Sequence, residues 1–173
     1  WAVEQGWPSF VATLLDLAHT AEAGSDHQLA FVNALTGSRL SDWHVEVLQE
    51  LLDADPATLG LKGLAVDTDL RWRIVYALAA AGELDSDGIE APFIDGEVEK
   101  DPTAAGRRHG ARAAAARPIA DVKEHAWSAV IGDDSLPNIT ARSIVEGFAP
   151  QGQSNLLGDF AQRYFDDIPQ VWE

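Results

Sequence analysis

The segment spanning residues 101–127, DPTAAGRRHGARAAAARPIADVKEHAW, restricts the possible folds more than any other part of the chain. Its first half consists mainly of arginine and small residues, and alanine lets a second backbone approach at little entropic cost. Pro118 must end that half, because the residue before a proline is pushed out of the α region. In the second half, Val122, Ala126 and Trp127 fall at helical spacing and form an apolar stripe. The segment therefore predicts two helices joined at a proline, the first of which lets another backbone come close.

The opening residues of this segment predict where its first helix begins. Asp101 is a residue type favoured at the N-cap, where a side-chain oxygen accepts a hydrogen bond from a free backbone N–H group. Pro102 suits the first helical turn, because its missing N–H would have had no partner there. The sequence thus predicts that Asp101 caps this helix.

Helical signals recur along the rest of the chain, and no segment shows a convincing period-two strand pattern. Ser25 and Gln28 match a capping box at the start of a helix. Residues 69–82 are apolar on nearly every side, which is typical of a helix buried between neighbours. We therefore predict an all-α fold of eight or nine helices in a single domain spanning residues 1–173. Its expected architecture is a curved array of antiparallel helix pairs, similar to a HEAT or armadillo superhelix.

Two helices near the N-terminus are expected to direct aromatic and aliphatic side chains toward the core. Apolar residues at helical spacing predict their buried faces. For the first helix these residues are Phe10, Leu14, Leu17 and Ala18, and for the second they are Trp43, Val47, Leu48, Leu51 and Leu52.

The charge and composition of the chain limit its expected partners. With a formal net charge of −16 at pH 7, it would be repelled by nucleic acid and by anionic membrane surfaces, so neither is an expected partner. No apolar run approaches the roughly 20 residues needed to span a bilayer. The chain contains no cysteine, which excludes thiolate metal sites and a cysteine nucleophile. A chain without cysteine also fits a reducing compartment, and we predict a cytoplasmic location.

The sequence contains no recognisable catalytic or metal-binding motif. A zinc peptidase of the common helical type needs two histidines one turn apart with a glutamate between them. No two of the histidines lie four residues apart on a predicted helix; they are His19, His27, His44, His109 and His125. We therefore predict no catalytic residue and no metal ligand in this chain.

A cluster of basic residues interrupts the acidic composition. It consists of Arg107, Arg108, His109, Arg112 and Arg117. Within it, Arg108 and Arg112 are one turn apart and share a helix face. Guanidinium groups bind carboxylates in a planar, paired geometry. We therefore predict that Arg107, Arg108 and Arg112 bind a carboxylate, either of a peptide terminus or of a neighbouring domain. The alternative is that they pair internally with the chain's own acidic residues.

Several short motifs follow one another along the chain in a recognisable order. They are Asp67-Thr68-Asp69-Leu70-Arg71-Trp72, Asp101-Pro102-Thr103, Gly106-Arg107-Arg108, Ala116-Arg117-Pro118, Lys123, Ala126-Trp127 and Leu136-Pro137-Asn138. This set resembles the C-terminal helical domain of aminopeptidase N-type zinc metallopeptidases, in the bacterial form that is similar to the endoplasmic reticulum aminopeptidase C-terminal domain. The resemblance covers most of the chain and is strongest over residues 65–172.

The resemblance implies a parent enzyme that removes N-terminal residues from peptides. In such enzymes zinc is held by two histidines and a glutamate of an upstream catalytic domain, so none of the family's catalytic or metal residues maps onto this sequence. The resemblance also implies that this chain is a non-catalytic C-terminal segment. Its expected partners are the upstream catalytic domain, over which it closes, and the peptide substrate, whose chamber it shapes. A chain that starts at Trp1 and contains no methionine fits the expectation of a piece of a larger protein.

A stand-alone helical-repeat scaffold that binds a protein partner is the alternative function. The sequence upstream of Trp1 would distinguish the two functions, because only the enzyme requires a zinc-binding HExxH motif there. Neither function predicts that this chain alone hydrolyses a substrate.

Overall fold

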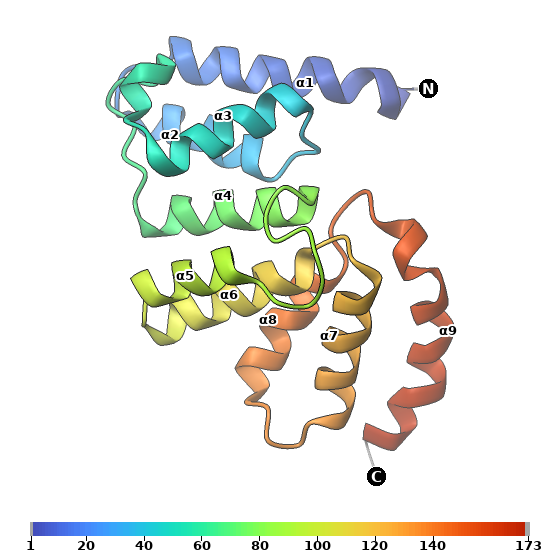
Figure 1. The fold of residues 1–173 in the computed structure, drawn as a ribbon. Coiled ribbons are helices and arrows are strands. Elements are labelled where there is room, and N and C mark those ends of the chain that lie inside the picture. The colour runs from blue at the N-terminus through green and yellow to red at the C-terminus, as the bar shows by residue number, and fades with distance from the viewer. Residues whose placement is uncertain (1, 172–173) are drawn as a thin grey trace. The chain divides into compact units, whose positions relative to one another are not determined.

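The computed structural model describes residues 2–171, with side chains placed for residues 6–167. Over that range the chain forms nine α-helices and one short 3₁₀-helix (Figure 1), and it contains no β-strand. The α-helices are α1 (Ala2–Thr20), α2 (Asp26–Thr36), α3 (Asp42–Asp53), α4 (Thr68–Ala81), α5 (Pro92–Lys100), α6 (Ala104–Ala116), α7 (Ala120–Gly132), α8 (Asn138–Phe148) and α9 (Ser154–Val171); the 3₁₀-helix is Pro56–Leu59. The all-α prediction and the expected number of helices are confirmed.

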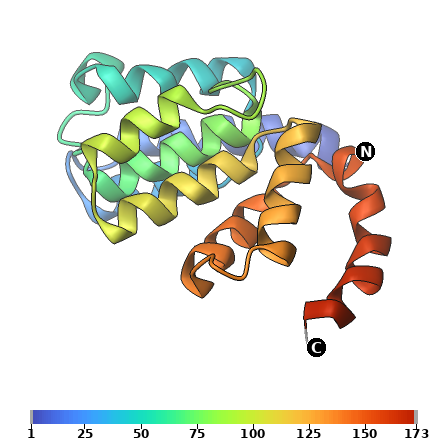
Figure 2. The ribbon, with the colours of Figure 1, turned by 60° about the horizontal axis from the view of Figure 1, so that its bottom comes forward.

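The helices belong to two compact units, Trp1–Leu78 and Ala79–Glu173, and the boundary falls in the last turn of α4. The first unit holds α1, α2, α3 and most of α4. The second unit holds the last residues of α4 and continues from the yellow-green α5 to the red α9 in Figure 2. Each unit has its own buried apolar residues. The curved superhelix and its repeat character remain predictions.

In the first unit, α1 buries a different face from the predicted one. Phe10 and Leu17 are 49% and 40% exposed, so the prediction that they face the core is wrong. The buried residues of this helix are Val11, Leu14, Leu15 and Ala18. These four also follow helical i, i+3, i+4, i+7 spacing, so the sequence offered two overlapping faces. Packing of α1 against α2 selects the second of them.

The predicted face of α3 is correct for its leucines and wrong for Trp43. The indole of Trp43 is 51% exposed, whereas His44, which the pattern missed, is 3% exposed. His44 Nδ1 lies 2.6 Å from Ser41 Oγ, so the Ser41 side chain is occupied by the histidine and does not cap the helix. Burial lowers the pKa of His44. The residues that bury the helix are His44, Val45, Leu48, Leu51 and Leu52.

The helix α2 begins as the sequence predicts. The Ser25 hydroxyl accepts a hydrogen bond from the backbone N–H of Gln28 at 3.2 Å. In a capping box the side chain at the fourth position returns to the N-cap N–H. Gln28 Oε1 instead accepts from the N–H of Gly24, one residue earlier, at 2.9 Å, and its Nε2 donates to the carbonyl of Ala18 at 3.2 Å. Gln28 thereby ties the start of α2 to the end of α1.

The helix α4 is buried on most of its surface, as its apolar sequence predicts. Its buried residues in the first unit are Leu70, Trp72, Ile74, Val75, Ala77 and Leu78. Its N-terminus is capped by Asp67, whose Oδ1 accepts from the N–H of Leu70 at 2.8 Å. Arg71 donates from Nη1 to the carbonyl of Leu52 at 2.6 Å. Arg71 thus binds the backbone at the end of α3.

In the second unit, α6 and α8 approach each other closely enough to require glycine. A Cβ atom built on Gly147 of α8 would overlap the carbonyl oxygen of Arg112 of α6 and lie 2.9 Å from its carbonyl carbon. On α6 the buried residues are Gly106, Gly110, Ala113, Ala115 and Ala116. The sequence predicts that the small side chains of α6 let a second backbone come close, and in the structure that backbone belongs to α8.

The start of α6 differs from the prediction. The N-cap is Thr103, whose hydroxyl accepts a hydrogen bond from the N–H of Gly106 at 3.0 Å. Asp101 instead ends α5, because its own N–H donates to the carbonyl of Glu97. The assignment of Asp101 as N-cap is therefore wrong, and the reason is that residues 92–100 form a helix that ends at Asp101. The Asp101 carboxylate still contributes by accepting a hydrogen bond from the Thr103 hydroxyl at 2.7 Å.

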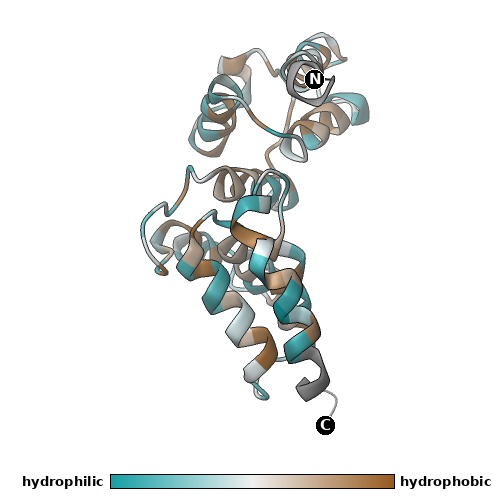
Figure 3. Ribbon diagram, turned by 90° about the vertical axis from the view of Figure 1, so that its right-hand side faces the viewer, coloured by the Kyte–Doolittle hydropathy of each residue, from teal (hydrophilic) through white to brown (hydrophobic). Residues whose placement is uncertain are grey.

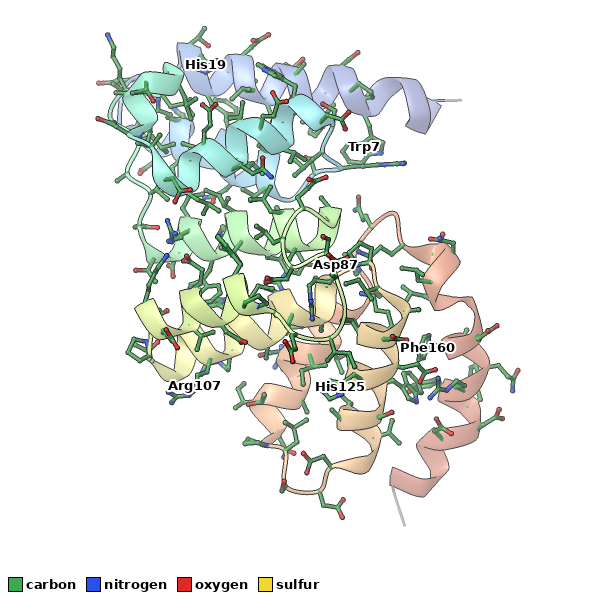
Figure 4. The ribbon with its side chains drawn as sticks, viewed as in Figure 1. Trp7, His19, Asp87, Arg107, His125 and Phe160 are labelled. Atoms are coloured by element: carbon green, nitrogen blue, oxygen red, sulfur yellow. The ribbon has the colours of Figure 1, made fainter. Side chains whose placement is uncertain are left out.

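Three aromatic rings join α7, α8 and α9. The ring centroids of Trp127 and Phe160 are 5.3 Å apart, and those of Phe148 and Phe160 are 5.0 Å apart. Phe160 points from α9 toward α7 (Figure 4), and the Trp127 indole N–H donates to Asp167 at 2.9 Å. Arg163 covers the Phe160 ring at 4.7 Å from its centroid. Hydrophilic and hydrophobic residues alternate along the helices of this unit, as the teal and brown colours in Figure 3 show.

Candidate functional site

The arginines predicted to bind a carboxylate all lie on α6. Arg107 is exposed, whereas Arg108 and Arg112 are half-buried. Successive residues of an α-helix are rotated by about 100°, so Arg107 projects from a different face than Arg108. Arg108 and Arg112 are one turn apart and share a face, as the spacing predicts. Arg108 and Arg112 therefore lie on one face of α6, and Arg107 lies on a different face.

These arginines differ in how they are engaged. Arg107 Nη1 folds back to the carbonyl of Pro102 at 2.8 Å, in the turn that precedes α6. Arg108 makes no hydrogen bond or ion pair with any other residue that the structure describes. Its guanidinium is therefore available to a ligand. Carboxylate binding by Arg107, Arg108 and Arg112 remains a prediction.

Arg117 separates from the basic cluster and has a structural role. Its side chain is 2% exposed. Nη1 donates to the carbonyl oxygens of Asp85 at 2.9 Å, Gly88 at 3.2 Å and Glu90 at 2.8 Å, and Nη2 donates to that of Ile89. A guanidinium has five N–H donors in a fixed plane, which suits several carbonyl groups at once. Arg117 therefore holds the loop before α5 in place.

That loop also caps α5 through Asp85. The carboxylate of Asp85 accepts from the backbone N–H of Phe93 at 2.9 Å and of Ile94 at 3.0 Å, two donors that a helix start leaves without partners. Asp85 itself has a positive φ of 49°, a conformation that aspartate adopts more readily than most residues. No pattern in the sequence indicates that Asp85 and Arg117 order this segment.

The C-terminus of α6 is closed by three side chains that come from outside the helix. Arg117 Nε donates to the carbonyl of Ala114 at 3.2 Å, Lys123 Nζ to that of Ala115 at 2.7 Å, and Gln153 Nε2 to that of Ala116 at 2.8 Å. Two of the three donors are cations, and the C-terminal end of a helix dipole favours positive charge. The only signal for this arrangement in the sequence is a basic residue directly before Pro118, at the predicted helix end.

Burial of Lys123 makes the stability of the chain depend on pH. Lys123 is fully buried, and this burial, together with the nearby Arg117 charge, lowers its pKa from 10.5 to about 8. Between these values the unfolded chain binds a proton that the folded chain has released. The free energy of unfolding should therefore rise by about 2.5 kcal/mol between about pH 7 and pH 10 on account of this residue.

Urea titrations of the chain and of Lys123→Met over this pH range measure that contribution. Methionine has a similar length and no charge, so the variant lacks the proton exchange at this position. The unfolding free energy of the unmodified chain should rise relative to that of the variant as the pH increases. Parallel curves for the two proteins would show that Lys123 keeps its proton when folded.

The described part of the chain contains no group of three or more histidine, aspartate or glutamate side chains that could hold a metal ion. Within the same residues, none of the helices has both the length and the apolar character that crossing a membrane requires.

Comparison with known proteins gives two matches. A family model described as the ERAP1-like C-terminal domain matches residues 2–173. The chain is also similar to a protein named Aminopeptidase N from Streptomyces lividans, with 43% identity over 158 residues. That alignment covers 90% of this chain and 18% of the relative, so the chain spans less than a fifth of the relative's length.

Proposed function

The chain belongs to the ERAP1-like C-terminal domain family, and from this we propose that it is the non-catalytic C-terminal segment of a zinc aminopeptidase. The parent enzyme removes N-terminal residues from peptides. The observation that carries this proposal is the 43% identity to a protein named Aminopeptidase N, which extends over nearly the whole chain. The same observation favours the enzyme over a stand-alone helical scaffold.

We assign the zinc ion to the catalytic domain of the parent. The histidines of this chain are far apart in sequence and occur on different elements, and no metal-binding group forms among its described residues. Zinc sites need three or four ligands within bonding distance of one point. We propose that this segment closes over the catalytic domain and shapes the chamber that receives the peptide, as the family resemblance implies. The cytoplasmic location stays a prediction from composition.

Within that role, we propose that the α6 arginines bind the carboxylate of the peptide substrate. Arg108 is the most informative position, because its replacement breaks no hydrogen bond or ion pair with the described residues. In the full-length parent, Arg108→Glu should raise KM about fivefold for a peptide with a free C-terminal carboxylate, which is the size of an exposed charge interaction. The same peptide with a C-terminal amide should show no change. Steady-state hydrolysis of both peptides provides the measurement.

Arg73→Glu is the matched control, because Arg73 is an exposed arginine of α4 that also has no partner among the described residues. It should leave both peptides unaffected. A loss of thermal stability in Arg108→Glu without any change in KM would show that the arginine is structural. A parent without aminopeptidase activity would contradict the proposed function itself.

A further inference from the structure

The second unit contains an apolar groove of about 280 Å³. It lies between α6, α7 and α8 and is bordered by α5 and the loop before it, near the labelled His125 in Figure 4. Its alanines are Ala91, Ala111, Ala114, Ala115, Ala126 and Ala129, and we call it the alanine groove. Small side chains on adjacent helices leave a space that the unit itself does not fill. The volume suits one or two side chains rather than a large ligand.

The apolar residues of the groove continue to its edge. Ile89, which lies in the loop before α5, is 49% exposed and lines the groove. Val122 and Ile144 line it from α7 and α8. An aliphatic side chain entering the groove would therefore remove apolar surface from water on both partners, which is the main source of affinity for such a site.

Charged groups at the groove favour a cation beside that aliphatic side chain. Glu90 and Asp95 line the groove and are exposed, so their carboxylates can reach a ligand. The guanidinium of Arg117 also lines it, but its N–H groups are occupied by backbone carbonyls. An arginine engaged in this way is a poor receptor for a carboxylate. The charge of Asp95 interacts with that of Arg117, but Glu90 adds a second carboxylate, so the acidic groups of the groove outnumber its arginine and attract a positive charge.

We propose that the alanine groove binds a segment of the peptide substrate in which an aliphatic side chain of leucine size lies next to a lysine or arginine. The aliphatic side chain enters the groove between α6 and α7, and the cation pairs with Asp95 and Glu90. This inference rests on the proposed function for the source of the peptide. It adds a preference for an aliphatic side chain next to a cation, whereas the α6 arginines would bind a carboxylate.

The test measures binding by this 173-residue chain with blocked peptides. The probe is acetyl-Gly-Leu-Lys-Gly-amide, and the comparison peptides carry glutamate in place of lysine or serine in place of leucine. Nuclear magnetic resonance titration should give a Kd of about 1 mM for the probe and at least fivefold weaker binding for both comparison peptides, roughly the effect of one surface charge or one buried side chain. Equal affinity for the lysine and glutamate peptides would overturn the proposal, as would no binding at about 10 mM probe.

Two pairs of variants locate the binding site. Ala129→Leu fills the groove and should weaken probe binding about tenfold, whereas Ala161→Leu on the exposed surface of α9 should not. Asp95→Asn keeps the shape of the groove and should remove most of the preference for lysine over glutamate. Asp134→Asn, an exposed carboxylate outside the groove, should preserve that preference. Unchanged binding by Ala129→Leu together with unchanged preference in Asp95→Asn would overturn the proposal.

The binding measurement separates this inference from the proposed function, because it requires no hydrolysis. Selective binding to a chain whose parent has no aminopeptidase activity would support the groove and contradict the proposed function. An active parent whose C-terminal segment shows no preference among the peptides would overturn the groove alone.

Discussion

Replacing Arg117 by methionine should lower the free energy of unfolding by about 3–5 kcal/mol, the range found when one partner of a buried polar network is removed. The guanidinium is 2% exposed and donates to four loop carbonyls between Asp85 and Glu90. Without it these groups lose their partners, and the loop that positions Asp85 at the start of α5 is released. Removal of its charge from the vicinity of Lys123 offsets a small part of this loss. Urea unfolding measures the total.

Two further variants make this result specific to the hydrogen bonds of Arg117. Arg117→Lys keeps the charge but not the planar set of donors, so its stability should lie between that of the unmodified chain and that of Arg117→Met. Arg142→Met removes an exposed arginine that pairs with Glu146 within α8, and it should cost less than about 1 kcal/mol. A change below about 1 kcal/mol in Arg117→Met would show that the loop does not depend on this side chain.

The second large effect is expected at Gly147. In an ordinary helix interior, alanine is about 1 kcal/mol more favourable than glycine. At Gly147 the added Cβ would overlap the Arg112 carbonyl, so α6 and α8 must move apart. We expect Gly147→Ala to reduce the free energy of unfolding by about 2–3 kcal/mol, because overpacking of a rigid contact outweighs the gain in propensity. The measurement is again urea unfolding.

Gly158→Ala is the matched control for that substitution. Gly158 also lies inside a helix, α9, and no atom outside its own helix backbone and chain neighbours lies within 4 Å of the position that an added Cβ atom would take. This variant should be more stable than the unmodified chain by about 0.5–1 kcal/mol. We expect the free energy of unfolding to fall in Gly147→Ala and to rise in Gly158→Ala. A stabilising Gly147→Ala would mean that α6 and α8 are farther apart than the structure shows.

Local signals in the sequence predict most of the helices. Proline and capping residues act within a few positions of themselves, so Ser25 and Pro118 mark their helix ends correctly. The errors occur where two local signals compete. Asp101 could either start α6 or end α5, and a hydrogen bond from its N–H to Glu97 decides for the second. Phe10 and Val11 offered alternative apolar faces on one helix, and the choice was made by a neighbouring helix.

The candidate site is less predictable than the fold, because it depends on contacts between distant residues. The sequence places Arg107, Arg108 and Arg112 on one helix, and the structure agrees. It also groups Arg117 with them, although this side chain is bound to a loop about thirty positions earlier. Composition cannot distinguish a guanidinium that awaits a ligand from one enclosed by carbonyls. The alanine groove likewise cannot be predicted from the sequence, because its walls come from four helices and a loop.

The side chain of Gln153 has a consequence for biosynthesis. Its amide donates to the carbonyls of Ala80 and Ala116, which precede it by 73 and 37 positions. A ribosome makes both acceptors well before it makes the donor, and domains generally assemble as their chains emerge. During that interval the two carbonyls lack the hydrogen bonds that Gln153 supplies. Gln153 lies directly before α9, so the hydrogen bonds that it makes to the ends of α4 and α6 can form only after α5 to α8 have been synthesised.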